Sequence, residues 1–230
     1  EVFMNSLNLK PIEKDRTLRA NVAELLREAI ISGKIPPKTK LVETQLSEAL
    51  KVSRGPLREA IRQLVDQGLI ESIPYTGTYV VGITVKDIQE LYSFRTEIER
   101  FAFTLAWEKR TDRFRDDLIM QKDRLTKAIN SGDAAGTIYE ELELHNVVYS
   151  YCGHDLLKDS WQRIRGRLHL YFTLHQKAHN RSGPSLTAHD EYVRLACGDD
   201  LDAMLEHVSS HMRQGYEKVE GYVSTINKNL

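Results

Sequence analysis

"KVSRGPLREAIRQLVDQGLIESIP", residues 51–74, decides the fold of the N-terminal part of the chain. Ser53 stands where a helix N-cap is expected, and Pro56 falls in the first turn, where the missing N–H has no intrahelical partner to lose. Leu57 and Ile61 belong to an apolar stripe at helical spacing, and Gly68 ends the pattern. The stretch therefore predicts an amphipathic helix followed by a β-type segment.

The elements around this helix complete a recognisable order. Apolar residues at helical spacing predict a helix over residues 16–32, which Gly33 and the Pro36-Pro37 pair end. A short second helix is predicted to begin near Glu43, and residues 51–53 leave room only for a tight turn. Two β-type segments, 69–73 and 78–82, flank a Pro-Tyr-Thr-Gly hairpin signal. This order predicts a winged helix-turn-helix over residues 1–83.

Residues 84–230 show only helical periodicity. Thr84 and Asp87 have the spacing of a capping box at the start of the first helix. Further helices are expected over residues 112–130, 133–151, 156–176, 186–197 and 201–226, with glycine-containing breaks between them. The sequence thus predicts a mainly α fold, in which the winged head is followed by an all-α antiparallel helical bundle.

Composition excludes some classes of protein. The 230 residues are 41% hydrophobic and 28% charged, and no apolar run approaches the roughly 20 residues of a membrane span. The sequence shows no secretory signal, and Cys152 and Cys197 are too few for a disulfide framework, so we expect a cytoplasmic protein. The net charge is −1, with 12 basic against 10 acidic side chains in residues 1–83. A nucleic-acid function must therefore rest on where the charges lie.

Arg54, Arg58 and Arg62 recur every four residues at the start of the predicted 53–68 helix. Positive charge there interacts unfavourably with the positive end of the helix macrodipole. A DNA duplex would offset this cost, because its phosphates and guanine edges accept hydrogen bonds from arginine. The alternative is an ordinary solvated helix face. On the DNA interpretation, Arg62 lies one turn deeper, and hydroxyl or amide groups are expected to approach phosphates from Thr44, Ser53 and Gly55.

Four side chains are predicted to converge inside the bundle. Glu141 and His145 are four residues apart on one helix face. His189 and His211 lie about 10 and 12 residues either side of a turn at 198–199, which places them side by side on antiparallel helices. One carboxylate and three imidazoles suit a divalent metal, with zinc, nickel and manganese all open. Three hydrogen-bonded core histidines are the alternative.

A second histidine pair competes with this set. His175 and His179 are also four residues apart, but they stand at the end of a predicted helix, and the sequence places no third ligand near them. The pair therefore predicts a metal site less well than the Glu141 set does.

The stretch "SGKIPPKTKLVETQLSEALKVSRGPLREAIRQLVDQGLIESIPYTGTYV" resembles the DNA-binding domain of GntR-type bacterial regulators, with Gly77 as the wing glycine. The helical remainder resembles the FadR-type effector domain called FCD, through "LYSFRTEIER", "ELELH", "AHDEY" and "SSHM" in order. The resemblance implies that Arg54 and Arg58 contact DNA, and it favours Glu141, His145, His189 and His211 as the metal ligands.

The same resemblance implies a function. FCD cavities take small carboxylates, Arg95 matches an arginine often found at the cavity, and Arg163 or Arg167 is expected near the metal. We therefore expect a homodimeric repressor on a short palindromic operator, whose DNA affinity changes when a small organic or sugar acid binds. Two alternatives are a metal-dependent hydrolase using the Glu/His cluster and an architectural DNA binder with an inert bundle.

Overall fold

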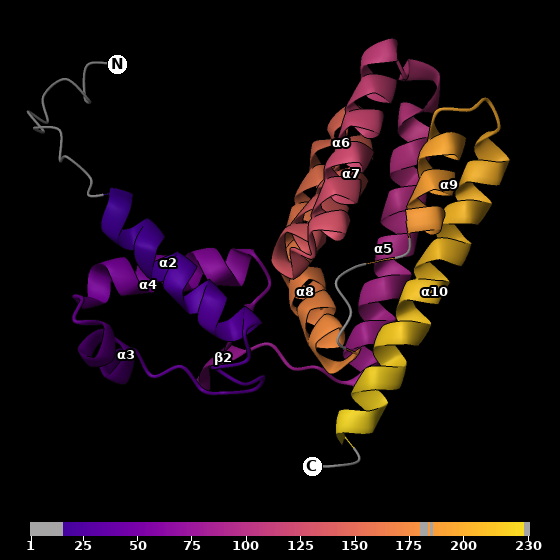
Figure 1. The fold of residues 1–230 in the computed structure, drawn as a ribbon. Coiled ribbons are helices and arrows are strands. Elements are labelled where there is room, and N and C mark those ends of the chain that lie inside the picture. The colour runs from indigo at the N-terminus through magenta and orange to yellow at the C-terminus, as the bar shows by residue number, and fades with distance from the viewer. Residues whose placement is uncertain (1–15, 180–183, 185, 228–230) are drawn as a thin grey trace, which may run out of the picture.

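The computed structural model describes residues 16–179, 184 and 186–227. Its elements in chain order are α2 (Arg16–Ile31), α3 (Glu43–Leu50), α4 (Arg54–Asp66), β1 (Ile70–Ile73), β2 (Gly77–Val80), α5 (Val85–Ala106), the 3₁₀ helix η1 (Trp107–Lys109), α6 (Asp112–Ser131), α7 (Ala134–Tyr151), α8 (Asp155–His179), α9 (Leu186–Ala196) and α10 (Leu201–Asn227). The predicted fold class is confirmed: a winged helix-turn-helix precedes a helical bundle (Figure 1). The 3₁₀ turn is not predicted by the periodicity.

The head, residues 16–81, is held together by the apolar faces of α2 and α4. Val22 and Leu26 from α2 pack in one buried cluster with Leu57 and Leu64 from α4. Lys51 joins α3 to α4 in a left-handed conformation with φ of 52°, which costs a non-glycine residue about 1 kcal/mol. The tight turn therefore fixes α4 across α3 and leaves the opposite face of α4 to solvent.

The wing is an antiparallel hairpin of β1 and β2. Ile70 pairs with Val80 at its base and Ile73 pairs with Gly77 at its tip. The segment before α3 runs along β2, where the Leu41 amide donates to the Thr78 carbonyl at 2.8 Å. This extra pairing anchors the wing to the segment that leads into α3.

Two helix starts test the predicted caps. Ser53 occupies the N-cap position of α4, but its side chain makes no capping hydrogen bond. Thr84 forms the predicted capping box: its hydroxyl accepts from the Asp87 amide at 3.1 Å, and the Asp87 carboxylate accepts from the Thr84 amide at 2.9 Å. The start of α5 is therefore fixed immediately after the wing.

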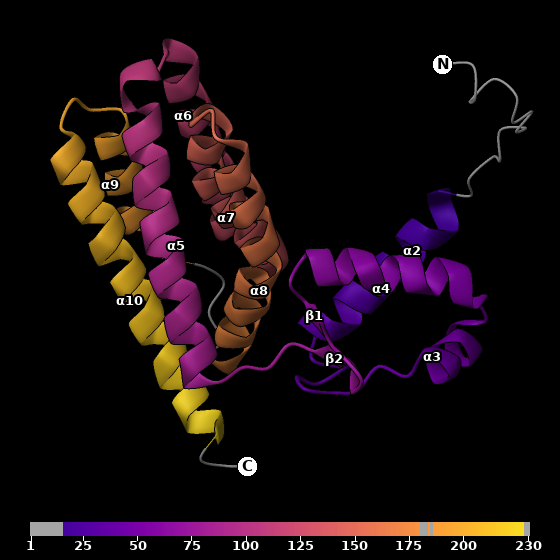
Figure 2. The same ribbon diagram turned by 180° about the vertical axis from the view of Figure 1, so that it is seen from behind.

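The bundle, residues 85–227, consists of α5–α10. Figures 1 and 2 show α5 running along α10 and α6 along α7, with α8 between the head and the remaining helices. Its core is aromatic: the rings of Tyr149 and Trp161 stack at 4.7 Å between centroids. Among the described helices, none combines the length and the apolar character that crossing a bilayer requires.

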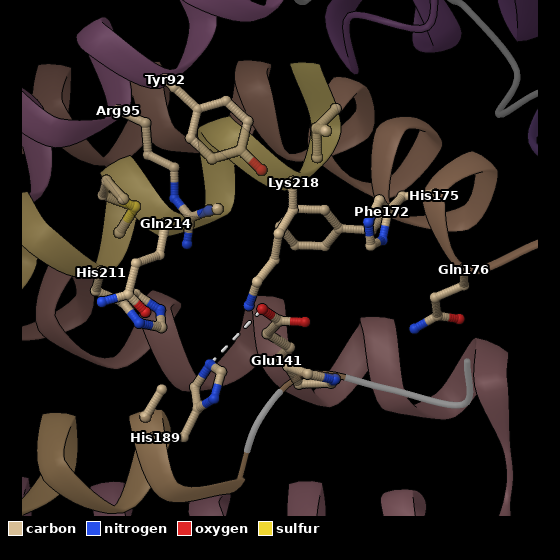
Figure 3. A pocket seen from close by; sticks show the side chains of 15 residues that line it. Tyr92, Arg95, Glu141, Phe172, His175, Gln176, His189, His211, Gln214 and Lys218 are labelled. Carbon is tan, nitrogen blue, oxygen red and sulfur yellow. Dashed lines mark ion pairs between the residues drawn. The ribbon is translucent and has the colours of Figure 1, made fainter. Parts of the chain in front are cut away.

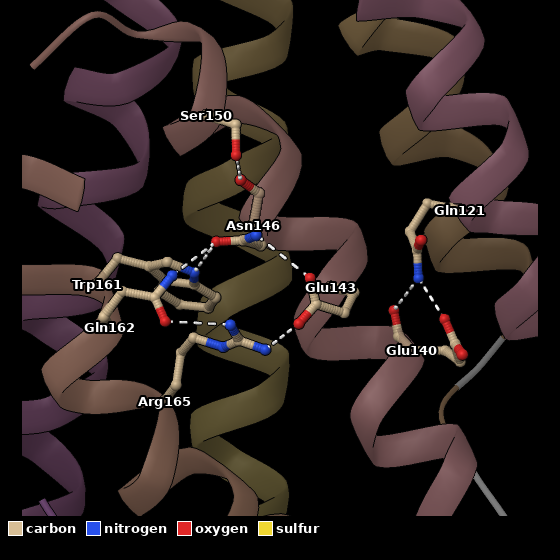
Figure 4. A network of polar contacts seen from close by, with 8 residues as sticks. All are labelled: Gln121, Glu140, Glu143, Asn146, Ser150, Trp161, Gln162 and Arg165. Carbon is tan, nitrogen blue, oxygen red and sulfur yellow. Dashed lines mark hydrogen bonds and ion pairs between the residues drawn. The ribbon is translucent and has the colours of Figure 1, made fainter. Parts of the chain in front are cut away.

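A polar seam joins α7 to α8 (Figure 4). The Asn146 side-chain oxygen accepts from Trp161 Nε1 at 3.0 Å and from Gln162 Nε2 at 3.1 Å. Its amide nitrogen donates to Glu143 at 3.2 Å, and Glu143 also pairs with Arg165. These bonds fix the rotation of α7, which carries two of the predicted metal ligands.

The head rests directly on the backbone of α8. A methyl group on Gly166 would overlap the carbonyl oxygen of Gln67, and one on Gly68 would lie 2.5 Å from the carbonyl oxygen of Arg163. Arg167 Nε donates to the Gly68 carbonyl at 3.3 Å. Only glycine fits at these two positions. The backbone of α8 therefore contacts the backbone that follows α4 directly, with no side chain between them.

Candidate metal and effector site

Three histidines from three helices meet inside the bundle. His145 comes from α7, His189 from α9 and His211 from α10, and one ring nitrogen of each lies within 4.8 Å of the others. The ring centroids of His189 and His211 are 4.9 Å apart, so the antiparallel turn between α9 and α10 brings them side by side. Three imidazoles at such distances could close around one divalent ion after a small adjustment of side chains.

Glu141 lies at the edge of this cluster. Its Oε1 is 3.6 Å from His189 Nε2, one helical turn before His145 on α7. Burial alone would raise the pKa of Glu141, but its contact with His189 and the charge of Arg95 lower the pKa overall. The side chain is therefore an ionised carboxylate, as a metal ligand must be.

The rings of His145 and His211 are held in the uncharged form. Burial lowers the pKa of His145 well below its ordinary value, and the positive charge of Arg95 lowers it further. Burial also lowers the pKa of His211, with neighbouring His189 as the next cause. Neutral imidazole is the form that binds metals, so these two rings need no deprotonation at pH 7 before an ion enters.

Sequence reasoning missed Glu99, a fully buried carboxylate behind the histidines. Its Oε1 lies 2.7 Å from His145 Nδ1 and accepts from the Tyr192 hydroxyl at 2.8 Å. Burial raises the pKa of Glu99 to about 7, against the opposing effects of Arg95 and Tyr192. The signal was available, because Arg95 and Glu99 have i,i+4 spacing on one helix.

His207 is the second residue that the sequence analysis overlooked. It stands one turn before His211 on α10, and the two rings are 5.8 Å apart. Its Nε2 is buried and has no hydrogen-bond partner. His207 therefore borders the cluster, although the three histidines named above form the group with metal-binding spacing among the described residues.

A cavity of about 320 Å³ opens beside the cluster, and Figure 3 shows the side chains that line it. His189, His211 and Glu141 form the wall on the side of the candidate metal site. The other polar lining includes Tyr92, Arg95, His175, Gln176, Gln214 and Lys218. The cavity is large enough for a small organic molecule and reaches the same groups that would hold the ion.

Arg95 is the cavity residue whose environment most favours an anion. It is 2% exposed, and its guanidinium lies 5.7 Å from the Trp161 ring and 5.9 Å from the Phe172 ring. Its Nε and Nη2 have no hydrogen-bond partner, although Nε lies 3.8 Å from the Glu99 carboxylate. Buried guanidinium donors of this kind are costly unless a ligand accepts from them.

Two sequence predictions are not met at this cavity. Arg163 and Arg167, expected near the metal, do not line the cavity: they lie on the α8 face that contacts the head, where Arg167 bonds the Gly68 carbonyl. Position on α8 decides this, because the helix turns Arg167 and the backbone carbonyl of Arg163 toward the head and Phe172 toward the cavity. His175 does line the cavity, while the side chain of His179 lies outside the described residues.

The predicted DNA-facing residues lie on the open face of the head. Arg54, Arg58 and Arg62 are all exposed on α4. Arg58 and Arg62 border a groove between α3, α4 and the wing, and Arg58 Nε bonds Glu43 at 2.7 Å. The surface thus offers three guanidinium groups, one of them positioned by an acidic side chain from α3.

The remaining predicted contacts surround this face. Thr44 is the second residue of α3, Ser53 precedes α4, and a Cβ on Gly55 would meet open space. At the wing, Gly77 has φ of 134°, a conformation that favours glycine, and Lys40 Nζ lies over the Tyr79 ring at 5.7 Å. Lys40 therefore brings a positive charge to a wing whose tip sequence has none.

Comparison with known proteins adds independent information. Residues 18–80 match the family model described as bacterial regulatory proteins, gntR family, and residues 90–214 match the FCD domain model. The chain is 27% identical to a gluconate operon transcriptional repressor of Bacillus licheniformis, over 89% of this chain and 84% of that protein. It is 24% identical to the Nta operon transcriptional regulator of Aminobacter aminovorans, over 85% of this chain and 93% of that protein.

A solved structure shares the architecture. A putative GntR transcriptional regulator from Rhodococcus sp. RHA1 superposes with a TM-score of 0.69 at 25% identity, covering 88% of this chain and 97% of the other. McbR/YncC of Escherichia coli gives a TM-score of 0.70 at 19% identity, covering 88% and 97%, which supports the fold.

Proposed function

Because the chain belongs to the GntR family of bacterial regulatory proteins and carries an FCD domain, we propose that it is a ligand-responsive transcriptional repressor. The head binds operator DNA through Arg54 and Arg58, and two copies of the chain bind the two halves of a short palindrome. The bundle binds a small organic acid or sugar acid next to a divalent metal. Binding of the acid changes the affinity of the head for DNA.

One observation carries this proposal: the buried, unpartnered donors of Arg95 line the same cavity as His189, His211 and Glu141. A carboxylate is the ligand that suits both Arg95 and the candidate metal site, because it can coordinate a metal and accept a bidentate bond from a guanidinium. The gluconate operon repressor among the relatives acts, by its name, on genes for a sugar acid. That relative favours a polyhydroxy acid as the first compound to test.

The metal would be held by His145, His189 and His211, with Glu141 as the fourth candidate ligand. Imidazole-rich ligation suits zinc or nickel, and the carboxylate also admits manganese. The ion would supply a fixed positive charge at the floor of the cavity. The protein side chains would then select the acid by its hydroxyl and carboxylate positions.

A hydrolase is less well supported. Metal-dependent hydrolysis requires a general base that can reach a metal-bound water. Glu99 accepts hydrogen bonds from Tyr192 and pairs with His145, and Glu141 pairs with His189. Both buried carboxylates of the cluster are therefore engaged in orienting side chains, and a DNA-binding head would serve no purpose in such an enzyme.

The experiment has two stages. Thermal-shift measurements with sugar acids and small organic acids, in the presence of zinc, nickel or manganese, should identify a stabiliser, since a ligand at 100 times its dissociation constant adds about 2.7 kcal/mol to stability. DNA selected by the protein from a random pool then serves as the probe for fluorescence anisotropy. The stabilising acid should change the DNA affinity in wild type and leave it unchanged in Arg95→Ala; stabilisation by neutral or cationic compounds alone would contradict the proposal.

A further inference from the structure

Glu99 is buried in the middle of α5, with no part of its side chain exposed. An isolated carboxylate in such a place would cost several kcal/mol, so its partners must repay its desolvation. The partners come from three helices: His145 from α7, Tyr192 from α9 and Arg95 one turn earlier on α5. This convergence points to a role beyond packing.

The bond between Glu99 and His145 sets the tautomer of the histidine when Glu99 is ionised. An ionised carboxylate can only accept, so the Nδ1 atom of His145, 2.7 Å from Glu99 Oε1, then carries the ring hydrogen. The lone pair is then on Nε2, which is buried and has no hydrogen-bond partner. In a purely structural core histidine this atom would remain unsatisfied, whereas a metal ion accepts its lone pair.

The other oxygen of the same carboxylate lies beside Arg95. Arg95 Nε is 3.8 Å from Glu99 Oε2, and the Trp161 and Phe172 rings flank the guanidinium. The Glu99 carboxylate and the two aromatic rings therefore hold the guanidinium at the cavity wall. Its Nη2 atom has no hydrogen-bond partner. One carboxylate thus contacts both the candidate metal ligand and the candidate anion receptor.

We propose that Glu99 is a positioning residue for both halves of the effector site: it fixes His145 with Nε2 free for the metal, and it holds Arg95 where an acid can reach it. This inference rests on the proposed function, because it assumes that the three histidines bind a metal. Outer carboxylates of this type raise the basicity of a ligating histidine, and their loss typically weakens metal binding about 10–100-fold. The two subsites are consequently linked through a residue that touches neither ligand.

Co²⁺ titration of the full chain, followed by visible absorption, tests the proposal. Glu99→Gln keeps the shape of the side chain and removes its charge, so Co²⁺ affinity should fall about 10–100-fold. The metal-free variant should melt below the wild type, because the buried charge of Arg95 loses its partner. The Co²⁺ affinity of the folded variant is therefore the deciding measurement: a merely structural role would lower the melting temperature and leave that affinity unchanged. Acetate, added to the Co²⁺-loaded protein as the simplest carboxylate probe, should also bind the variant more weakly.

Glu97→Gln is the matched control, because Glu97 is exposed on the same helix, and it should behave as wild type. If Glu99→Gln does not fold, Glu99→Asp keeps the charge but withdraws the carboxylate by one methylene, and it too should bind Co²⁺ more weakly. Wild-type affinity and an unchanged spectrum in a folded Glu99 variant would overturn this inference alone. Failure of the wild-type chain to bind Co²⁺, zinc, nickel or manganese would instead overturn the proposed function.

Discussion

The head and the bundle carry their functional groups in opposite environments. On α4, Arg54 and Arg58 project into solvent, where the proposed DNA ligand would meet them. In the bundle, Arg95 and His145 are buried, and both lie beside the buried carboxylate of Glu99. A change at an exposed group should affect binding and leave the fold intact, whereas a change at a buried group should affect binding and stability together.

The largest difference between the regions should appear when metal is removed. A chelator should lower the melting temperature of the bundle, because a bound ion ties α7, α9 and α10 together; the loss is about 2.7 kcal/mol if the ion was present at 100 times its dissociation constant. Calorimetry with and without chelator measures the shift. His189→Ala and His211→Ala should abolish the response, while His175→Ala should keep it. An undiminished chelator effect in His189→Ala would exclude this histidine as a ligand.

The second prediction concerns DNA. Arg54→Ala and Arg58→Ala should each weaken binding to the selected DNA by about 1–3 kcal/mol for a base contact, or reduce the salt dependence by about one charge for a phosphate contact. Anisotropy titrations at two salt concentrations distinguish these cases. Melting temperature and the chelator response should stay at wild-type values. If both variants bind DNA normally, α4 is not the recognition helix.

Glu43 pairs with Arg58 in the free head, so a change at Glu43 should alter the DNA affinity through Arg58. The same anisotropy titrations measure this effect in Glu43→Gln. Loss of DNA binding in Glu43→Gln would show that the pair positions Arg58, whereas a gain would show that the pair competes with phosphate.

The third prediction tests the contact between the regions. Gly166→Ala places a methyl group against the backbone oxygen of Gln67, so the head must shift on α8 at a cost of about 1–3 kcal/mol. Gly221→Ala on α10 meets open space and should instead stabilise by up to about 1 kcal/mol. Denaturant unfolding of the two variants gives the contrast. Equal stabilities would mean that the close approach of head and bundle does not exist in solution.

The stability of the protein should also depend weakly on pH through a histidine on α8, the helix that contacts the head. Burial lowers the pKa of His169 on α8 to about 4, and the charges of Arg165 and Arg27 contribute. The unfolded chain, with a histidine pKa near 6.5, then binds more protons than the folded chain between pH 6.5 and 4, so stability falls as pH decreases through this window. The loss is about 1 kcal/mol from pH 6.5 to 5.5. His169→Gln should flatten this part of the stability curve; an unchanged slope would assign it to other groups.

The same contrast explains what the sequence could predict. The position of Ser53, the capping box at Thr84 and the left-handed turn at Lys51 depend on a few neighbouring residues, so local patterns identify them. The approach of His189 to His211 was also predictable, because one short turn relates their helices.

Other features depend on packing between distant segments. Glu99 reaches His145 across 46 positions and Tyr192 across 93. The direction of Arg167 depends on how α8 meets the head, which helical periodicity does not reveal. Local structure was therefore more predictable than the contacts between distant segments.

The central claim is that the bundle holds one divalent metal through His145, His189 and His211, and elemental analysis measures it most directly. Protein purified near neutral pH without chelator should contain about one zinc, nickel or manganese ion per chain, and the His189→Ala, His211→Ala double variant should contain almost none. Wild-type protein without stoichiometric metal, which also takes up none on dialysis against these ions, would contradict the claim and return the three histidines to a structural role.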